Sequence, residues 1–314
     1  MITRVPVSQA DALLCASYQL YRHTGTNKTT IRTAGYGHPA ALHAHVQTVA
    51  PTTYFASPRK SSINEAAVMV NATSEELKGV PFRCDDYITP SFLRSLYKTE
   101  TYPPAAIDKN VLEVLGFADQ YPSEEDFKYF MIDYRKDAVA ATYTVEQVNN
   151  GGYDQRYPGE EANMNVQYAG AISFPTPQIF YSIGGWKEWS DDDGEPERGD
   201  AYLEWLRYIL NEPTVPQTIS ISYGDPETDF PEEYVTFLCK LFARLGVRGV
   251  SVLVASGNEG VGSGACYDRS GRVRRFVNEF PASCTCGHLS FLAHSNKSRK
   301  SLTRSPLFFR SLCH

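Results

Sequence analysis

Two short stretches hold the side chains best suited to chemistry, and the first follows an apolar run late in the chain. Ser256, Gly257 and Asn258 open a segment that stays rich in glycine as far as Gly264. Glycine permits sharp turns and lets a ligand approach the backbone closely. An asparagine there can donate a hydrogen bond into a cleft. A glycine-rich loop with only a structural use fits the same spacing, so the segment needs support from elsewhere.

The second stretch runs from Glu161 to Tyr168. Glu161 and Asn165 are four residues apart, so a helix would place them on one face, where they can touch. A carboxylate held by an amide is an oriented pair of the kind that a general base requires. The alternative is a glutamate favoured by the positive end of a helix, with Asn165 merely exposed.

The elements around the glycine-rich segment indicate a parallel sheet. The runs Thr218–Tyr223 and Val250–Ala255 are apolar and predict buried strands. Between them lies an amphipathic helix, which Asp229 and Pro231 are expected to start and Gly246 to end. Two buried strands joined through a helix are typical of parallel sheets, whose sites lie at the carboxyl ends of the strands.

The same alternation extends upstream and predicts an α/β fold with a doubly wound parallel sheet. The expected strands are 111–117, 140–148 and 178–183, and the expected helices are 90–97, 124–134, 161–172 and 201–210. Residues 1–55 instead predict a small α+β unit, with helices at 9–15 and 39–49 and a hairpin of 18–23 with 29–33. Residues 56–83 show no periodicity and are interpreted as a linker.

Composition limits the partners and the compartment. The formal net charge of −6 argues against nucleic acid, and no apolar run is long enough to span a bilayer. The first thirty residues lack the apolar core of a secretory signal. The seven cysteines show no zinc-ligand spacing, and Cys266 and Cys284 flank one loop and could pair in an oxidising compartment.

Taken together, four motifs resemble the sedolisin family of serine-carboxyl peptidases, in its fungal tripeptidyl-peptidase branch. In order they are ITPSFLRSLY at 88–97, GEEANMNVQY at 159–168, SYGDPETDFPEEY at 222–234, and VLVASGNEGVGSGAC…FPASC at 252–284. The first 55 residues resemble the end of that family's propeptide. The resemblance covers roughly residues 4–284 and implies a subtilisin-like fold, here as a partial catalytic domain at 84–284.

The resemblance also implies roles for single residues. Glu161 corresponds to the general base, Asn165 to the residue that orients it, and Asn258 to the oxyanion donor. The expected substrate-binding residues are Ser222, Tyr223, Gly224, Ser256 and Gly257. The strand at 222–224 would pair with the substrate backbone.

Two of these positions depart from the family in a way that bears on pH. Asn165 and Asn258 stand where the family usually has aspartate. An amide donates a hydrogen bond at any pH, whereas an acid must first be protonated, so both changes predict a working pH nearer neutral.

A third departure concerns residues 285–314, where the family reaches its serine in an SGTSAS-like motif and later a calcium site. This segment has neither; it contains five Lys/Arg and no acidic residue. We interpret it as an atypical tail unrelated to the fold, such as a frame change in the gene, with a basic binding tail as the alternative. The chain as written is then expected to be catalytically silent, to hold no cofactor or metal, and to lack its front as well.

The function predicted for the parent protein is a secreted, monomeric serine-type peptidase that releases tripeptides from protein amino termini, or acts as an endopeptidase. The alternative is a non-catalytic peptide-binding protein that keeps the substrate strand. A subtilisin with a histidine base is disfavoured because no histidine lies between residues 46 and 287.

Overall fold

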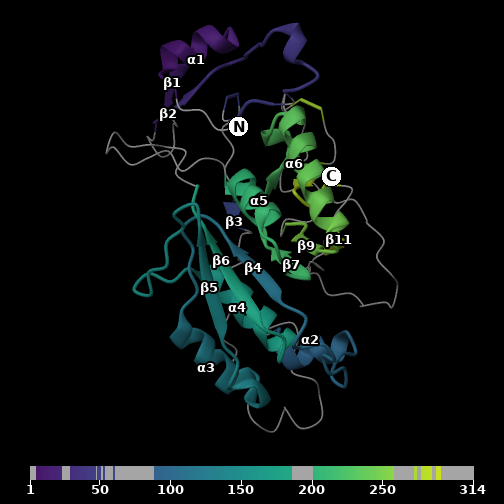
Figure 1. Cartoon of the computed structure of the whole chain (residues 1–314). Coiled ribbons are helices and arrows are strands. Elements are labelled where there is room, and N and C mark those ends of the chain that lie inside the picture. The colour runs from purple at the N-terminus through teal and green to yellow at the C-terminus, as the bar shows by residue number, and fades with distance from the viewer. Residues whose placement is uncertain are drawn as a thin grey trace.

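A computed structural model describes the chain over residues 5–22, 29–46, 48–50, 52–53, 59–60, 88–185, 201–257, 272–273, 277–284 and 288–290. Its centre is a parallel sheet, shown in Figure 1, with the strand order β11-β9-β7-β4-β6-β5. The strands are β4 (Leu112–Gly116), β5 (Tyr143–Val148), β6 (Gln178–Ile183), β7 (Thr218–Ile221), β9 (Ser251–Ala255) and β11 (His288–Ser290). From β4 the chain runs to the edge strand β5, returns to β6 beside β4, and then crosses to the other side of β4 to add β7, β9 and β11 in turn. Strands on both sides of β4 confirm the predicted doubly wound α/β fold.

Helices cover both faces of this sheet (Figure 1). The helices α3 (Glu124–Tyr134) and α4 (Glu160–Ser173) bury Phe127, Met131 and Val166 against one face. The helices α5 (Ala201–Asn211) and α6 (Glu232–Val247) bury a larger apolar set against the other face. Strands that are covered on both faces are apolar along most of their length, and for this reason the sequence pattern located β4, β6 and β9.

A second sheet has three strands in the order β10-β8-β3. They are β10 (Glu279–Phe280), β8 (Tyr223–Pro226) and β3 (Arg59–Lys60). Here the prediction of one strand over Thr218–Tyr223 was wrong in its boundary. The chain leaves the main sheet at Ser222, and β8 pairs antiparallel with β10 on one side and β3 on the other. A short strand that changes sheets cannot be recognised from alternation alone, because its partners are distant in sequence.

The amino-terminal unit contains α1 (Val7–Leu14) and a hairpin of β1 (Gln19–Arg22) with β2 (Thr29–Arg32). The predicted helix over 39–49 is reduced to one 3-10 turn, Ala40–Leu42. The helix α2 (Pro90–Leu96) begins as predicted, since the Thr89 side chain accepts a hydrogen bond from the Phe92 amide. The start of α6 differs: its N-cap is Pro231, and Asp229 lies in a preceding 3-10 turn.

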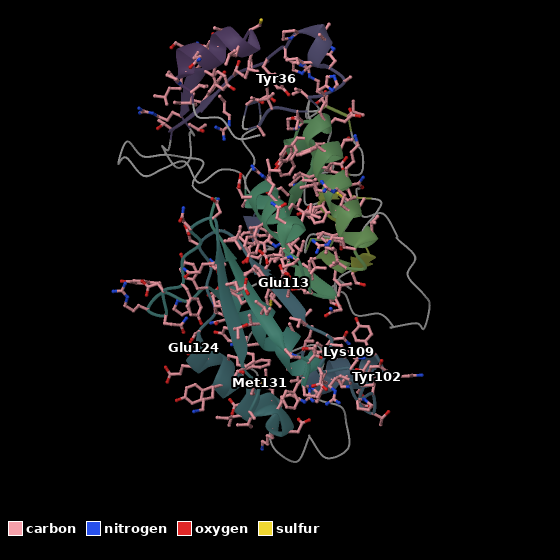
Figure 2. All side chains as sticks on the ribbon, viewed as in Figure 1. Tyr36, Tyr102, Lys109, Glu113, Glu124 and Met131 are labelled. Carbon is pink, nitrogen blue, oxygen red and sulfur yellow. A yellow bond between two sulfur atoms is a disulfide. The ribbon has the colours of Figure 1, made fainter. Side chains whose placement is uncertain are left out.

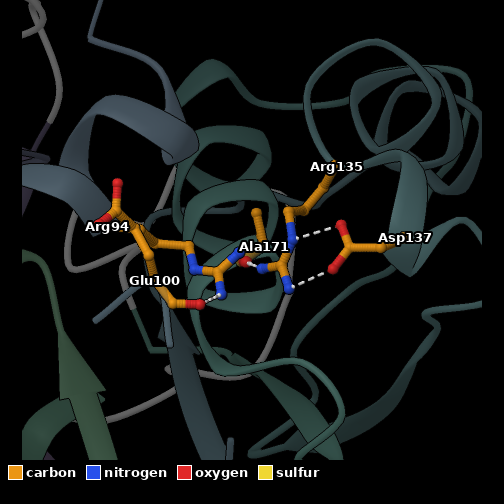
Figure 3. A network of polar contacts seen from close by, with 5 residues as sticks. All are labelled: Arg94, Glu100, Arg135, Asp137 and Ala171. Carbon is orange, nitrogen blue, oxygen red and sulfur yellow. Dashed lines mark hydrogen bonds and ion pairs between the residues drawn. The ribbon is translucent and has the colours of Figure 1, made fainter. Parts of the chain in front are cut away.

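An arginine network fastens the ends of α3 and α4, at the amino edge of the sheet (Figure 3). The buried Arg135 donates to the Ala171 carbonyl and forms a two-pronged pair with Asp137, with N–O distances of 2.7 and 2.9 Å. The guanidinium beside Asp137 lowers the pKa of that carboxyl. Nearby, Arg94 donates to the Glu100 carbonyl at 2.8 Å.

The disulfide joins Cys239 to Cys284, with a Cα–Cα distance of 5.2 Å. The suggested pairing of Cys266 with Cys284 was therefore wrong, and Cys266 lies outside the described residues. The pairing could not be inferred from closeness in sequence, because the partner of Cys284 is Cys239 on α6, and Cys284 lies in the turn after β10. Of the tail expected to stand apart from the fold, His288–Ser290 pair with β9 as β11, so this part does join the sheet.

Candidate active site

The general-base candidate lies in the first turn of α4. Glu161 has no exposed surface. The helix begins at Gly159, whose amide donates to the Tyr121 carbonyl at 2.8 Å, so the loop after β4 fixes the helix start. A side chain at Gly159 would collide with Gln120, which explains the glycine. The positive end of the helix favours a negative carboxylate at this point.

Tyr223 on β8 connects this glutamate to the second sheet. Its phenol is fully buried, and its pKa is raised by burial and further by the charge of Glu161. Its carbonyl accepts a hydrogen bond from the Tyr202 hydroxyl at 2.9 Å, and its ring meets Phe117 edge-on at 5.2 Å. The side chain of Tyr223 is therefore closed off from solvent, and only its backbone is available to a peptide strand.

The orienting pair predicted from the helix spacing is incomplete. Asn165 lies one turn beyond Glu161 on α4 and is half-buried. Its Nδ2 is buried and donates to no acceptor among the described residues. Catalytic hydrogen bonds are often long in unliganded proteins and tighten with substrate, so the role assigned to Asn165 stays a prediction.

Two glycines lie close to an acidic side chain of β10, the strand that pairs with β8. A Cβ added at Gly224 would lie 2.8 Å from Cγ of Glu279, and one added at Gly257 would lie 3.4 Å from its Cδ. Both glycines therefore approach one carboxylate, and Gly257 adopts φ +86°, a conformation that favours glycine. The structure thus brings the substrate-binding candidates of β8 and of the β9 end together around Glu279.

The remaining candidates are only partly placed. Ser222 lies at the break between β7 and β8, and Ser256 directly follows β9. Asn258, the predicted oxyanion donor, lies outside the described residues, so its relation to Glu161 stays a prediction.

Two acidic residues of this region were not singled out from the sequence. Glu279 lies in a short strand without periodicity, and only its pairing with β8 reveals its position. Asp225 is buried in the same sheet, opposite Phe280 and therefore on the other face from Glu279. A carboxylate directly after the Ser-Tyr-Gly run was the one available signal for Asp225.

Among the described residues, no three side chains of His, Cys, Asp or Glu gather as a metal site. No helix in that part of the chain is both long and apolar enough to cross a bilayer.

Comparison with known proteins decides the family. Residues 1–55 match the family described as Pro-kumamolisin, activation domain. The chain is 33% identical over 289 residues to the probable tripeptidyl-peptidase SED3 of Trichophyton verrucosum, covering 89% of this chain and 48% of that protein. It is 32% identical over 289 residues to the tripeptidyl-peptidase SED3 of Arthroderma otae, with the same coverages of 89% and 48%. This chain belongs to the sedolisin family.

A solved sedolisin of Pseudomonas, a serine-carboxyl proteinase complexed with two molecules of pseudo-iodotyrostatin, is a more distant match. The TM-score is 0.43 at 16% identity, over 64% of this chain and 52% of that one. The chain spans about half the length of the curated sedolisin relatives that it matches. Their activity as whole proteins is therefore carried to this chain only as a proposal.

Proposed function

We propose that this chain contributes the base and the substrate-binding strand of a serine-type peptidase, which releases tripeptides from amino termini or cleaves internally. The observation that carries the proposal is Glu161, which is fully buried at the start of α4, at the carboxyl edge of the sheet. In this role Glu161 accepts the proton of an attacking serine hydroxyl, and the Asn258 amide donates to the oxygen that becomes negative.

The second sheet supports the proposed mode of substrate binding. Arg59 and Lys60 pair with Gly224 and Tyr223 as an antiparallel strand. The edge of β8 therefore accepts an extended segment through backbone hydrogen bonds, as a peptide substrate requires. Side chains of alternate substrate residues then face the two sides of this sheet.

The charge around β8 favours one class of substrate side chain. Residues directly opposite in an antiparallel pair project to the same face. At Gly224 that face holds Glu279. A substrate residue opposite Gly224 would thus project beside a carboxylate, and we propose a preference there for lysine or arginine. The chain's own residue at this register is Arg59.

A peptide-binding protein without catalysis is the second candidate, and the occupied β8 edge favours it equally. The two differ in the nucleophile. A transcript that encodes an SGTSAS-like run after Cys284 in another frame, with a product that reacts with a fluorophosphonate serine probe, supports the peptidase. A transcript that ends as in this sequence, with a purified chain that binds peptides but does not react with the probe, supports the binding protein.

Export is part of the proposal. The Cys239–Cys284 disulfide suits an oxidising compartment, where such bonds persist. We therefore propose a secreted protein that meets peptides or unfolded proteins outside the cell and acts as a monomer. Mass spectrometry of culture medium under non-reducing conditions tests this directly: the disulfide-linked peptides should be recovered from secreted material.

A further inference from the structure

A buried carboxyl lies at the other end of β4 from the proposed active site. Glu113 has no exposed surface and belongs to the face of the sheet that α5 and α6 cover. Its neighbours in register are Ile179 on β6 and Ile219 on β7. Figure 2 labels it in the middle of the molecule. An ionisable group in such apolar surroundings is rare unless it is paired.

Only one of the two carboxyl oxygens has a partner. The Trp205 indole Nε1 donates to Oε1 of Glu113 at 3.0 Å. Oε2 is buried and has no hydrogen-bond partner among the described residues. A carboxylate with one neutral donor is poorly solvated, whereas a neutral carboxylic acid in the same place needs far less stabilisation.

The groups facing Glu113 add negative charge rather than positive. On β5, Glu146 accepts a hydrogen bond from the Tyr208 hydroxyl of α5 at 3.0 Å. On β6, burial raises the pKa of the Tyr181 phenol and Glu146 raises it further, so this neighbour is neutral and offers Glu113 no positive charge.

None of the described basic residues on the covering helices, Arg207 on α5 and Lys240 and Arg244 on α6, forms an ion pair or hydrogen bond with Glu113, and neither does Arg248 directly after α6. Arg207 contacts Glu204 at 3.5 Å, and Arg248 donates to the carbonyls of Ile209, Leu210, Glu212 and Pro213. Burial, with a smaller contribution from Glu146, raises the pKa of Glu113 from its ordinary 4.5 to about 8, although the Trp205 hydrogen bond opposes the shift.

We propose that Glu113 is a proton-binding switch of folding: the native domain holds it as a neutral carboxylic acid, and the fold is favoured in acidic surroundings. Below about pH 4.5 the side chain is protonated in both the folded and the unfolded chain, and it has no effect on pH dependence. Between about 4.5 and 8 only the folded chain binds this proton, so its contribution to stability is lost progressively as the pH rises. Each pH unit in this window lowers the folding equilibrium constant by roughly tenfold.

The test compares the full chain with Glu113→Gln, which keeps an acceptor for the Trp205 N–H but cannot ionise. Chemical denaturation is followed from pH 5 to pH 8. We expect the ratio of the two folding constants, variant over wild type, to rise by roughly tenfold per pH unit. Glu204→Gln on the outer side of α5 is the matched control and should leave the profile unchanged. A ratio that stays constant across the window overturns the proposal.

A second measurement reads the protonation state directly. Infrared spectra of the wild-type chain at pH 7 should show the carbonyl band of a protonated carboxylic acid, because exposed acids are ionised at that pH. The band should be weaker in Glu113→Gln, since the buried Glu161 and Asp225 are common to both proteins. The band should be lost on unfolding at the same pH. Its absence from the native spectrum overturns the proposal whatever the variant does, and neither experiment depends on the chain being a peptidase.

Discussion

Two glutamates, both without exposed surface, lie at opposite ends of the same sheet and in opposite surroundings. Glu161, near the carboxyl edge, lies in the first turn of α4, where the helix dipole favours a charged group. Glu113, near the amino edge, lies among apolar side chains with one indole donor. The two carboxyls are therefore equally buried but differ in their position relative to a helix start. We expect the carboxyl edge of the sheet to carry function and the amino edge to carry stability.

The largest effect that would test this division is at Glu161. In a product that includes the serine segment, Glu161→Gln should lower kcat/KM by about 10²–10⁴-fold, because proton transfer from the serine is lost. Peptide affinity and thermal stability should change little. The neighbouring Glu160→Gln is the matched control, since Glu160 is exposed. Equal losses in the two variants would remove Glu161 from the base role.

At the amino edge of the sheet we expect the reverse, a loss of stability without a loss of peptide binding. Arg135→Ala should lower the free energy of unfolding by about 2–4 kcal/mol, because the Ala171 carbonyl loses its buried donor and a well-packed side chain is removed. Peptide binding at β8 should remain. Arg156→Ala, which removes an exposed pair with Asp154 and a cation–π contact with Tyr157, is the control and should leave the denaturation midpoint in place. An Arg135→Ala protein as stable as the wild type would contradict the stabilising role given to the amino edge.

A smaller effect concerns pH at the carboxyl edge. Asn258→Asp replaces a permanent donor with an acid that donates only when protonated. The pH profile of kcat should therefore move toward acid by about one unit or more. Asn110→Asp on the surface should not move it. An unchanged profile in Asn258→Asp would show that this residue does not face the developing negative charge.

The smallest effect expected is on substrate preference. Glu279→Gln should reduce the preference for lysine over glutamine opposite Gly224 by roughly fivefold, the size of a partly exposed ion pair of about 1 kcal/mol. Glu279→Asp keeps the charge and should retain most of the preference. Competition between paired peptides measures the ratio directly. If the wild type and both variants show the same preference, Glu279 does not select the substrate residue.

The sequence predicted the layers of the fold well, because burial on both faces imposes a strong local pattern. The helix Glu124–Tyr134 and the strand Gln178–Ile183 were predicted with the observed bounds. What failed depended on distant partners. The exit of β8 from the main sheet, the pairing of Cys284 with Cys239 and the packing of Glu279 over Gly224 all join segments far apart in sequence.

The site shows the same limit. The i, i+4 spacing placed Glu161 and Asn165 on one helix, which the structure has, but not the hydrogen bond between them. Glu113 was read only as part of an apolar strand, since nothing local marks it as a lone acid in the core. Its single hydrogen bond is with Trp205, which is 92 residues away in sequence.

The strand β3 has a consequence for any peptide that approaches this protein. Arg59 and Lys60 already occupy the edge of β8 and are covalently joined to it through the chain. A tethered competitor acts at an effective concentration of the order of millimolar, so a free peptide of micromolar intrinsic affinity meets steep competition for the same backbone groups. Cutting the chain after Lys60 turns that competitor into one that dilutes away, and the edge of β8 then becomes available to peptides supplied from solution.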